Sequence, residues 1–199
     1  MEISEIDICN RALTEYLGVK PIMGFDEKTD AARVCKQNYA AARRDALAGS
    51  LWAFASMWHA GVALALDPKS PWLYCFTYPT DALRVFEIQR ASEADPLIPF
   101  EVTDRPDGVD GKMIHCNLSA PVFVYTRDKE NPAQYDVEFV AALAALLAEK
   151  IAIPLTKNLK IKQTAMQAYV NLRGIALARS LNEGPRDTDA LGFHHQARG

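Results

Sequence analysis

The segment Phe139–Ala148 has ten consecutive residues without a polar side-chain atom, the longest apolar run in the chain. It is rich in Ala and Leu, which have high helix propensity, and a helix that is apolar on every side has to be covered on every side. A membrane span would need about 20 apolar residues, but Glu149, Lys150 and Pro154 follow too soon. The run therefore predicts a buried helix, and its small Ala side chains suit either a helical core or a contact between subunits.

Composition and charge exclude several classes of function. The 199-residue chain is 49% hydrophobic and 24% charged, which is typical of globular proteins. Its net charge of -3 does not favour non-specific binding of nucleic acid through bulk charge. The acidic N-terminus has no apolar signal segment, so we expect synthesis in a reducing cytoplasm. We expect free buried thiols, no metal site and no cofactor, because no Cys-x-x-Cys pair occurs among Cys9, Cys35, Cys75 and Cys116.

Two helices are predicted before residue 50. Ser4 and Asp7 have the spacing of a capping box, which marks the start of the first helix. The second helix is predicted over about Thr29–Ala48, with Arg43 and Arg44 on its polar side. Such a pair is typical of a solvated helix face, although it could also meet phosphate.

The segment Ser50–Leu66 is aromatic and hard to assign. Trp52 and Phe54 alternate as in a strand, but the alternation then breaks, which leaves helix and strand difficult to separate. We expect an extended start followed by a short helical or irregular piece. His59 has no partner at metal-ligand spacing, so we interpret it as a satisfied or surface histidine.

A β pattern extends from Asp67 to about Asn131. Segments rich in aromatic and β-branched residues alternate there with turn signals that contain Pro, Asp and Ser. Short strands at this spacing are typical of a small antiparallel sandwich or barrel. The predicted strands are Trp72–Tyr78, Leu83–Gln89, Ile98–Thr103, Lys112–Asn117 and Val122–Thr126.

Two further helices are predicted after the β segment. The first covers Tyr135–Ile153, where Pro154 interrupts or ends it because proline removes a backbone donor. The second covers about Asn158–Ser180, and Gly174 within it suggests a close neighbour, since glycine otherwise weakens a helix. Its expected apolar face consists of Ile161, Ala165, Ala168, Leu172 and Ile175.

The order of these segments predicts an α+β fold. We expect the N- and C-terminal helices to form a four-helix bundle, with a small antiparallel β-sandwich or barrel inserted between them. The expected divisions are the first half of the bundle (1–66), the inserted β domain (67–132), the second half of the bundle (133–181) and a flexible tail (182–199).

The tail is polar, as disordered segments are. Leu191 and Phe193 are its only large apolar side chains, so the sharper interpretation is a docking peptide that uses them as anchors. His194 and His195 could not complete a metal site by themselves.

No catalytic motif occurs. The chain lacks a nucleophile elbow, a Walker sequence, a Rossmann fingerprint and a His-Glu-x-x-His segment. Paired carboxylates can cleave glycosides, so one alternative is a soluble enzyme such as a carboxylate-based cell-wall hydrolase, and another is a generic helical binding module. The carboxylates that would serve an enzyme are Glu87, Glu93, Asp95 and Glu101 in the β segment, but no pattern identifies a catalytic residue among them.

Five segments in order resemble tail tubular protein A, the head-to-tail adaptor family of short-tailed bacteriophages. Each is weakly specific alone, and together they span roughly residues 8–178. The tyrosine before Pro79 departs from the leucine that is common in the family. The segments are Ile8–Val19, the helix with Ala31–Cys35 and Arg44–Leu47, Trp52–Ala55, Tyr74–Val85, and Tyr135–Phe139 at the start of the Ala/Leu helix.

The resemblance implies a structural virion protein in the tail or neck, not an enzyme. Members of the family form a dodecameric ring between the portal and the tail nozzle, and double-stranded DNA passes through it without sequence-specific binding. It further implies that the protein binds the portal protein, the tail nozzle protein and other copies of itself, and that it does not bind a membrane. Leu191 and Phe193 are the expected anchors for docking to the portal. The smaller connectors of long-tailed phages are the nearest alternative. The residues expected to be fold-forming are Trp52, Phe54, Tyr78, Pro79, Asp81, Tyr135 and Phe139.

Overall fold

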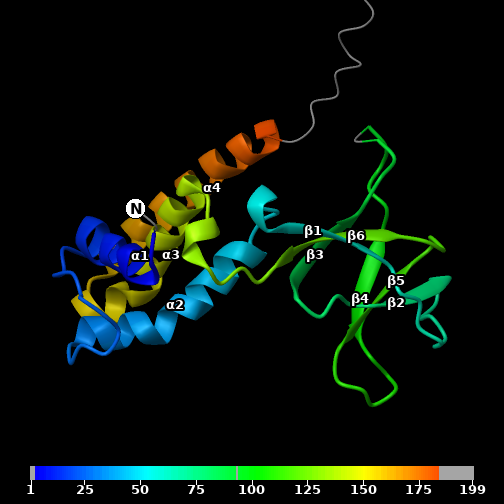
Figure 1. Ribbon diagram of the computed structural model, residues 1–199, viewed down its shortest axis with the longest axis horizontal. Coiled ribbons are helices and arrows are strands. Elements are labelled where there is room, and N and C mark those ends of the chain that lie inside the picture. The colour runs from blue at the N-terminus through cyan, green and yellow to red at the C-terminus, as the bar shows by residue number, and fades with distance from the viewer. Residues whose placement is uncertain (1–2, 93, 184–199) are drawn as a thin grey trace, which may run out of the picture.

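The computed structural model describes residues 3–92 and 94–183 and has a mixed α+β fold, with helices at one end and two sheets at the other (Figure 1). The helical part is built from both ends of the described chain, and the strands come from between them. In chain order the elements are α1 (Glu5–Arg11), η1 (Ala12–Leu17), α2 (Asp30–Ala48), η2 (Ala53–Ala55), β1 (Ser56–Ala60), β2 (Tyr74–Thr77), β3 (Ala82–Ile88), β4 (Phe100–Asp104), β5 (Lys112–Cys116), β6 (Val122–Arg127), η3 (Pro132–Gln134), α3 (Val137–Thr156) and α4 (Leu159–Glu183).

The predicted capping box at the start of α1 is confirmed. The Asp7 N–H donates to Ser4 Oγ at 3.1 Å, and the Ser4 N–H donates to the Asp7 carboxylate at 2.9 Å. After α1 the chain continues as the π-helix η1, which ends at Gly18 with a left-handed φ of 64°. The Asn10 side chain then exchanges two hydrogen bonds with the backbone of Ile22, at 2.9 and 2.7 Å. The loop before α2 is therefore held against the first helix.

Helix α3 lies at the centre of the helical part, as its apolar sequence requires. It packs against α1, η1, α2 and α4, so the prediction of a buried helix is confirmed. Within the described residues, α3 is the one helix long and apolar enough to cross a membrane. Of its most apolar stretch, 61% is buried inside the fold. Its buried residues include Phe139, Ala142, Leu143, Ala144, Ala145, Leu147, Ala148, Ile151 and Ala152.

Pro154 does not end α3, contrary to the predicted boundary at Ile153. The helix continues to Thr156, because a proline in the last turn removes only one backbone donor. The end comes at Lys157, which has a left-handed φ of 53° and whose N–H donates to the Ile153 carbonyl at 2.9 Å. A left-handed residue of this kind is a common helix stop.

Two expectations for α4 are wrong. Ile175 is 52% exposed, whereas Ala176 is 4% exposed and belongs to the core, because the inward face continues from Leu172 by four residues rather than three. Gly174 has no close neighbour, since a side chain there would meet no atom within 4 Å. The outer side of α4 therefore carries exposed apolar residues.

The strands form two antiparallel three-stranded sheets. One has the order β1-β6-β3 and the other the order β2-β5-β4. All five strands predicted between residues 72 and 126 are present. One apolar cluster joins the two sheets, and in it the Phe76 and Phe123 rings meet edge to face at 5.8 Å. Its buried members are Phe76, Val85, Ile88, Ile114, Cys116, Phe123 and Tyr125.

The β structure begins at Ser56, earlier than the predicted start at Asp67. The aromatic segment also has the reverse of its predicted order, because the short helix η2 comes first and the strand β1 follows. In β1, Trp58 and His59 lie opposite Val124 and Phe123 of β6. The backbone partner of β1 is thus a strand from the far end of the β segment, and such pairing is not encoded in local alternation.

We expect Leu143→Ala in α3 to lower the free energy of unfolding by about 2–5 kcal/mol, because it leaves a cavity at a fully buried position. Leu97→Ala removes the same atoms from a side chain that is 68% exposed, and we expect it to change stability by less than about 0.5 kcal/mol. Urea unfolding followed by circular dichroism measures both. Equal effects of the two substitutions would contradict the central position of α3.

Candidate functional site: the joint between helices and sheets

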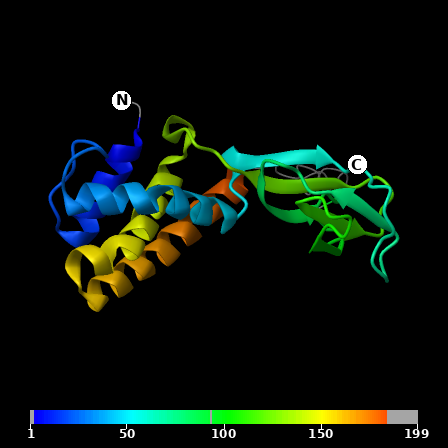
Figure 2. The ribbon, with the colours of Figure 1, turned by 90° about the horizontal axis from the view of Figure 1, so that it is seen from below.

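The chain crosses between the helical part and the sheets through residues 49–56 and residues 127–137 (Figures 1 and 2). We call the joint the region where these crossings meet the end of α2, the start of α3 and the turn formed by residues 78–82. The residues expected to be fold-forming lie in or beside the joint.

Four of those residues form one aromatic cluster. The Trp52 and Phe139 rings meet edge to face at 4.9 Å, and Phe54 lies 5.0 Å from Phe139. Tyr135 packs edge to face on Phe139 at 5.0 Å and lies 5.8 Å from Phe54. The Trp52 indole N–H donates to the Ala46 carbonyl of α2 at 2.9 Å. Aromatic pairs in these arrangements stabilise by about 0.5–1.5 kcal/mol beyond the area that they bury.

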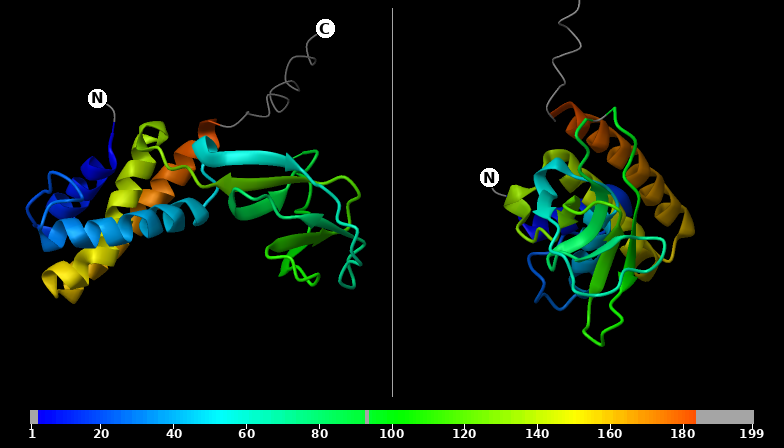
Figure 3. Two further views of the ribbon diagram at one scale, coloured as in Figure 1. Left: turned by 60° about the horizontal axis from the view of Figure 1, so that its bottom comes forward. Right: turned by 90° about the vertical axis from the view of Figure 1, so that its right-hand side faces the viewer.

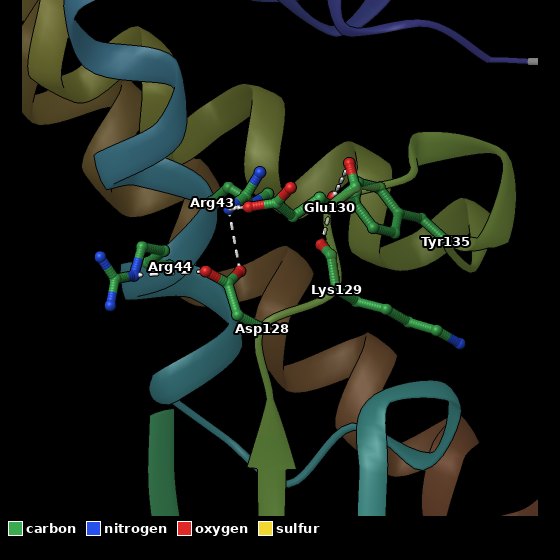
Figure 4. A network of polar contacts seen from close by, with 6 residues as sticks. All are labelled: Arg43, Arg44, Asp128, Lys129, Glu130 and Tyr135. Carbon is green, nitrogen blue, oxygen red and sulfur yellow. Dashed lines mark hydrogen bonds and ion pairs between the residues drawn. The ribbon is translucent and has the colours of Figure 1, made fainter. Parts of the chain in front are cut away.

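A buried arginine links α2 to the second crossing (Figure 4). Arg43 Nη2 lies 2.9 Å from the Asp128 carboxylate and 3.3 Å from that of Glu130, and the Arg43 side chain is only 7% exposed. Arg44 pairs with the other oxygen of Asp128 at 3.4 Å but is 61% exposed. The expectation of a solvated arginine pair is therefore wrong for Arg43 and holds for Arg44.

Lys129 and Tyr135 fix the chain between these carboxylates and α3. Lys129 Nζ donates to the Phe54 carbonyl at 2.7 Å and lies 5.6 Å from the centre of the Phe54 ring. The Tyr135 hydroxyl donates to the carbonyls of Lys129 and Glu130, at 2.7 and 3.1 Å. Burial lowers the pKa of Lys129. Burial is also the main cause that raises the pKa of Tyr135 to about 12.

The turn between β2 and β3 is attached to the same crossing. The Ala82 N–H donates to the Pro79 carbonyl at 3.2 Å and closes the turn, and the Tyr78 hydroxyl accepts from the backbone of β3. The Asp81 carboxylate accepts from the Tyr125 hydroxyl at 2.8 Å. Its carbonyl accepts from the Asp128 N–H at 3.3 Å. A single residue of the crossing, Asp128, thus contacts both the turn and α2.

Sequence reasoning missed the polar half of the joint. Asp128, Lys129 and Tyr125 had no assigned role, and Arg43 was placed on a solvated face. No local signal identifies these partners, because the ion pair joins residues 85 positions apart. The aromatic and turn-forming residues of the joint could be predicted from sequence. These residue types indicate burial or a turn without reference to a distant partner.

Three of the four carboxylates considered for an enzyme are engaged in structural contacts. Glu101 accepts from Lys69 Nζ at 2.5 Å and from the Trp72 indole at 2.8 Å, and these bonds hold its pKa below the usual value. Asp95 accepts from the Ser92 N–H at 3.0 Å. Glu87 lies 3.6 Å from Arg90, and Glu93 is outside the described residues. A general acid needs a raised pKa, which is the opposite of the shift at Glu101.

Metal ligation finds no support within residues 3–92 and 94–183. There, no three His, Cys, Asp or Glu side chains form a group that could hold an ion, and the four cysteines are free and buried. His59 is half-buried in β1. The proposed anchors Leu191 and Phe193, and the pair His194 and His195, lie outside the described residues.

Comparison of the chain with protein-family models and with curated proteins finds no match. The resemblance of the five segments and the geometry of the joint are therefore the observations that bear on function.

We expect Arg43→Ala to lower the free energy of unfolding by about 3–5 kcal/mol, because it leaves the Asp128 carboxylate partly buried without its main partner. Arg44→Ala removes an exposed partner of the same carboxylate and should cost less than about 1 kcal/mol. Chemical denaturation of both variants tests this. A loss for Arg44→Ala as large as that for Arg43→Ala would contradict the assigned roles.

Tyr135→Phe should make stability less sensitive to alkaline pH. The pKa of Tyr135 is raised to about 12 in the folded protein, compared with about 10 in an unfolded chain. The unfolded state therefore loses this proton first, and stability falls as the pH rises from about 10 to about 12. The variant lacks this contribution, so its stability should decline less steeply over that range.

The control is Tyr74→Phe, at a tyrosine that is 40% exposed in β2. It should keep the alkaline decline of the wild type when both are unfolded by urea at a series of pH values. Identical pH dependence in the wild type and Tyr135→Phe would show that the buried hydroxyl does not remain protonated.

Proposed function

We propose that this protein is the subunit of a head-to-tail adaptor of a short-tailed bacteriophage. Copies of the chain form a ring between the portal and the tail nozzle, and double-stranded DNA passes through the lumen during ejection. The protein is a structural component of the virion neck and is made in the host cytoplasm. Its partners are other copies of itself, the portal protein and the nozzle protein.

The convergence of four of the five resembling segments at the joint is the observation that supports this proposal. Arg44, Trp52, Asp81 and Tyr135 come from these four segments, and each contributes an ion-pair, packing or hydrogen-bond contact to this one region. Residues that an enzyme needs would instead bring a nucleophile, acid or base together in a pocket. Residues that hold a helical part and a β part together suit a subunit that links two neighbours in an assembly.

The proposal includes a finer description of the fold. We propose that the helices from the two ends of the chain act as one four-helix bundle and that the two sheets act as an inserted β-sandwich. The two parts lie at opposite ends of the molecule (Figure 1), which offers separate surfaces for two different partners. A ring of identical subunits additionally needs heterologous contacts that close by rotation.

Charge supports passage of DNA rather than its capture. Each phosphate contact made by a lysine or arginine adds salt-dependent affinity, and affinity inside a lumen would slow translocation. The net charge of -3 is compatible with a wall that DNA slides past. The hydrogen bonds to Glu101 hold its pKa below the usual value, which does not suit the general acid of a hydrolase.

The test is to mix the purified protein with the portal protein encoded beside it and to image the mixture by electron microscopy. We expect a second ring stacked on the portal ring. Free monomers beside bare portal rings would overturn the adaptor function and would return attention to the alternative of a soluble enzyme or a generic binding module.

The docking role of Leu191 and Phe193 can be tested in the same assay. Leu191→Ala with Phe193→Ala should reduce the fraction of portal rings that carry a second ring. The matched control is His194→Ala with His195→Ala, which changes neighbouring residues and should leave that fraction unchanged. Full assembly of the Leu191 and Phe193 variant would remove the anchor role while leaving the adaptor function intact.

A further inference from the structure

The sheet formed by β1, β6 and β3 packs one face on the second sheet and turns its other face, the outer face, away from it. Phe123 and Tyr125 of β6 belong to the apolar cluster between the sheets, so Val124 between them belongs to the outer face. Trp58 of β1 lies opposite Val124 and is 60% exposed. An exposed tryptophan is the type of side chain that most often anchors a contact between proteins.

Strand pairing arranges the outer face in three rows that cross the sheet. The first row, at the start of β1, reaches Arg84 of β3 through Thr126 of β6. The middle row contains Trp58, and the third row contains Ala60 and Val122. Successive rows are about 7 Å apart, because they are two residues apart along each strand.

The first row carries a cation that has no ion pair within the described part of the chain. Arg84 is exposed, and its guanidinium lies 5.0 Å from the centre of the Phe86 ring. The nearby charges of Glu87 and Arg90 pair with each other at 3.6 Å, and Arg127 belongs to the inner side by strand alternation. The outer face therefore offers a positive charge in its first row and apolar side chains in the next two.

Helix α4 ends at Glu183, beside the first row. Arg173 Nε donates to Ser50 Oγ at 2.7 Å, and Arg173 Nη2 donates to the Gly49 carbonyl at 2.6 Å. These bonds fix α4 to the segment that leads into β1. The end of α4 lies close to the start of β1, on the side away from the second sheet (Figures 1 and 3). The chain that follows Glu183 therefore begins next to the outer face.

Residues 184–199 lie outside the described part of the chain, but their sequence matches the order of the rows. Asp189, Leu191 and Phe193 alternate along it, so in an extended segment they share one side at intervals of about 7 Å. The six residues from Glu183 to Asp189 can span about 20 Å. That length allows an acidic side chain to reach the first row, with two apolar side chains following it.

We propose that residues 189–193 bind the outer face of the sheet in their own chain. Asp189 pairs with the cation of the first row, Leu191 packs on the middle row and Phe193 packs on the third row. The short connection to α4 supplies a high effective concentration, so a contact of this small size is sufficient. The inference concerns the free chain and goes beyond the proposed adaptor function.

The contact has a consequence for the proposed portal anchors. Leu191 and Phe193 cannot occupy the outer face and the portal at the same time. The two surfaces therefore compete for this pair, and the free chain keeps its anchors on its own sheet.

The experiment is acrylamide quenching of tryptophan fluorescence in the full chain. The contribution of Trp58 is obtained by subtracting the signal of the matching chain with Trp58→Phe. We expect Trp58 to be shielded in the wild type, although it is 60% exposed when residues 184–199 are not placed on it. Leu191→Ala with Phe193→Ala should shift its emission to longer wavelength and increase its quenching, because water then reaches the indole.

The matched control is His194→Ala with His195→Ala, which changes neighbouring residues and should leave Trp58 shielded. A charge exchange tests the first row. Arg84→Asp and Asp189→Arg should each increase the quenching of Trp58, and the two together should restore the shielding, because opposite charges face each other again. Circular dichroism confirms that each variant is folded before the comparison is made.

Two outcomes overturn the inference. Equal quenching of Trp58 in the wild type and in the Leu191 and Phe193 variant would exclude the contact. Shielding that increases with protein concentration would show that a second copy, rather than the same chain, supplies the bound segment. Either result leaves the adaptor function to be judged separately, by whether the wild-type protein forms a second ring on the portal.

Discussion

The need to cover α3 on every side is the constraint on which the rest of the structure depends. The apolar run from Phe139 to Ala148 has to be covered around the whole helix, so α1, η1, α2 and α4 all pack against α3. That requirement draws the two ends of the described chain together. The β segment, which lies between them in sequence, is then left outside the helical core and has to be attached to it.

The attachment is made by the joint, where apolar and ionic contacts work together. The cluster of Trp52, Phe54, Tyr135 and Phe139 supplies the apolar contacts, and the buried side chain of Arg43 supplies the ionic ones. Ion pairs strengthen as the surroundings lose water, but burying a charge is costly unless its partners are in place. Asp128 therefore has two roles. Its carboxylate pairs with Arg43, and its backbone N–H donates a hydrogen bond to the carbonyl of Asp81 in the turn. A joint of this kind holds the helices and sheets in one fixed relation.

Where a structure is encoded by nearby residues, the sequence predicted it well. The capping box at Ser4, the helix over Asp30–Ala48 and five of the six strands follow from spacing, periodicity and turn residues. The aromatic and turn-forming members of the joint were also found from sequence. The predictions failed at β1 and at Arg43, and in each case the partner is distant in sequence.

The sequence by itself determined the identity of most helices and strands and the presence of one helix that must be buried, because periodicity and side-chain type act over a few residues. Only the tertiary structure decided that β1 pairs with β6, that Arg43 turns inward to Asp128 and that the face of α4 continues through Ala176 rather than Ile175. These features depend on which distant groups come together, and the free energy of burial and pairing, rather than local propensity, makes that choice.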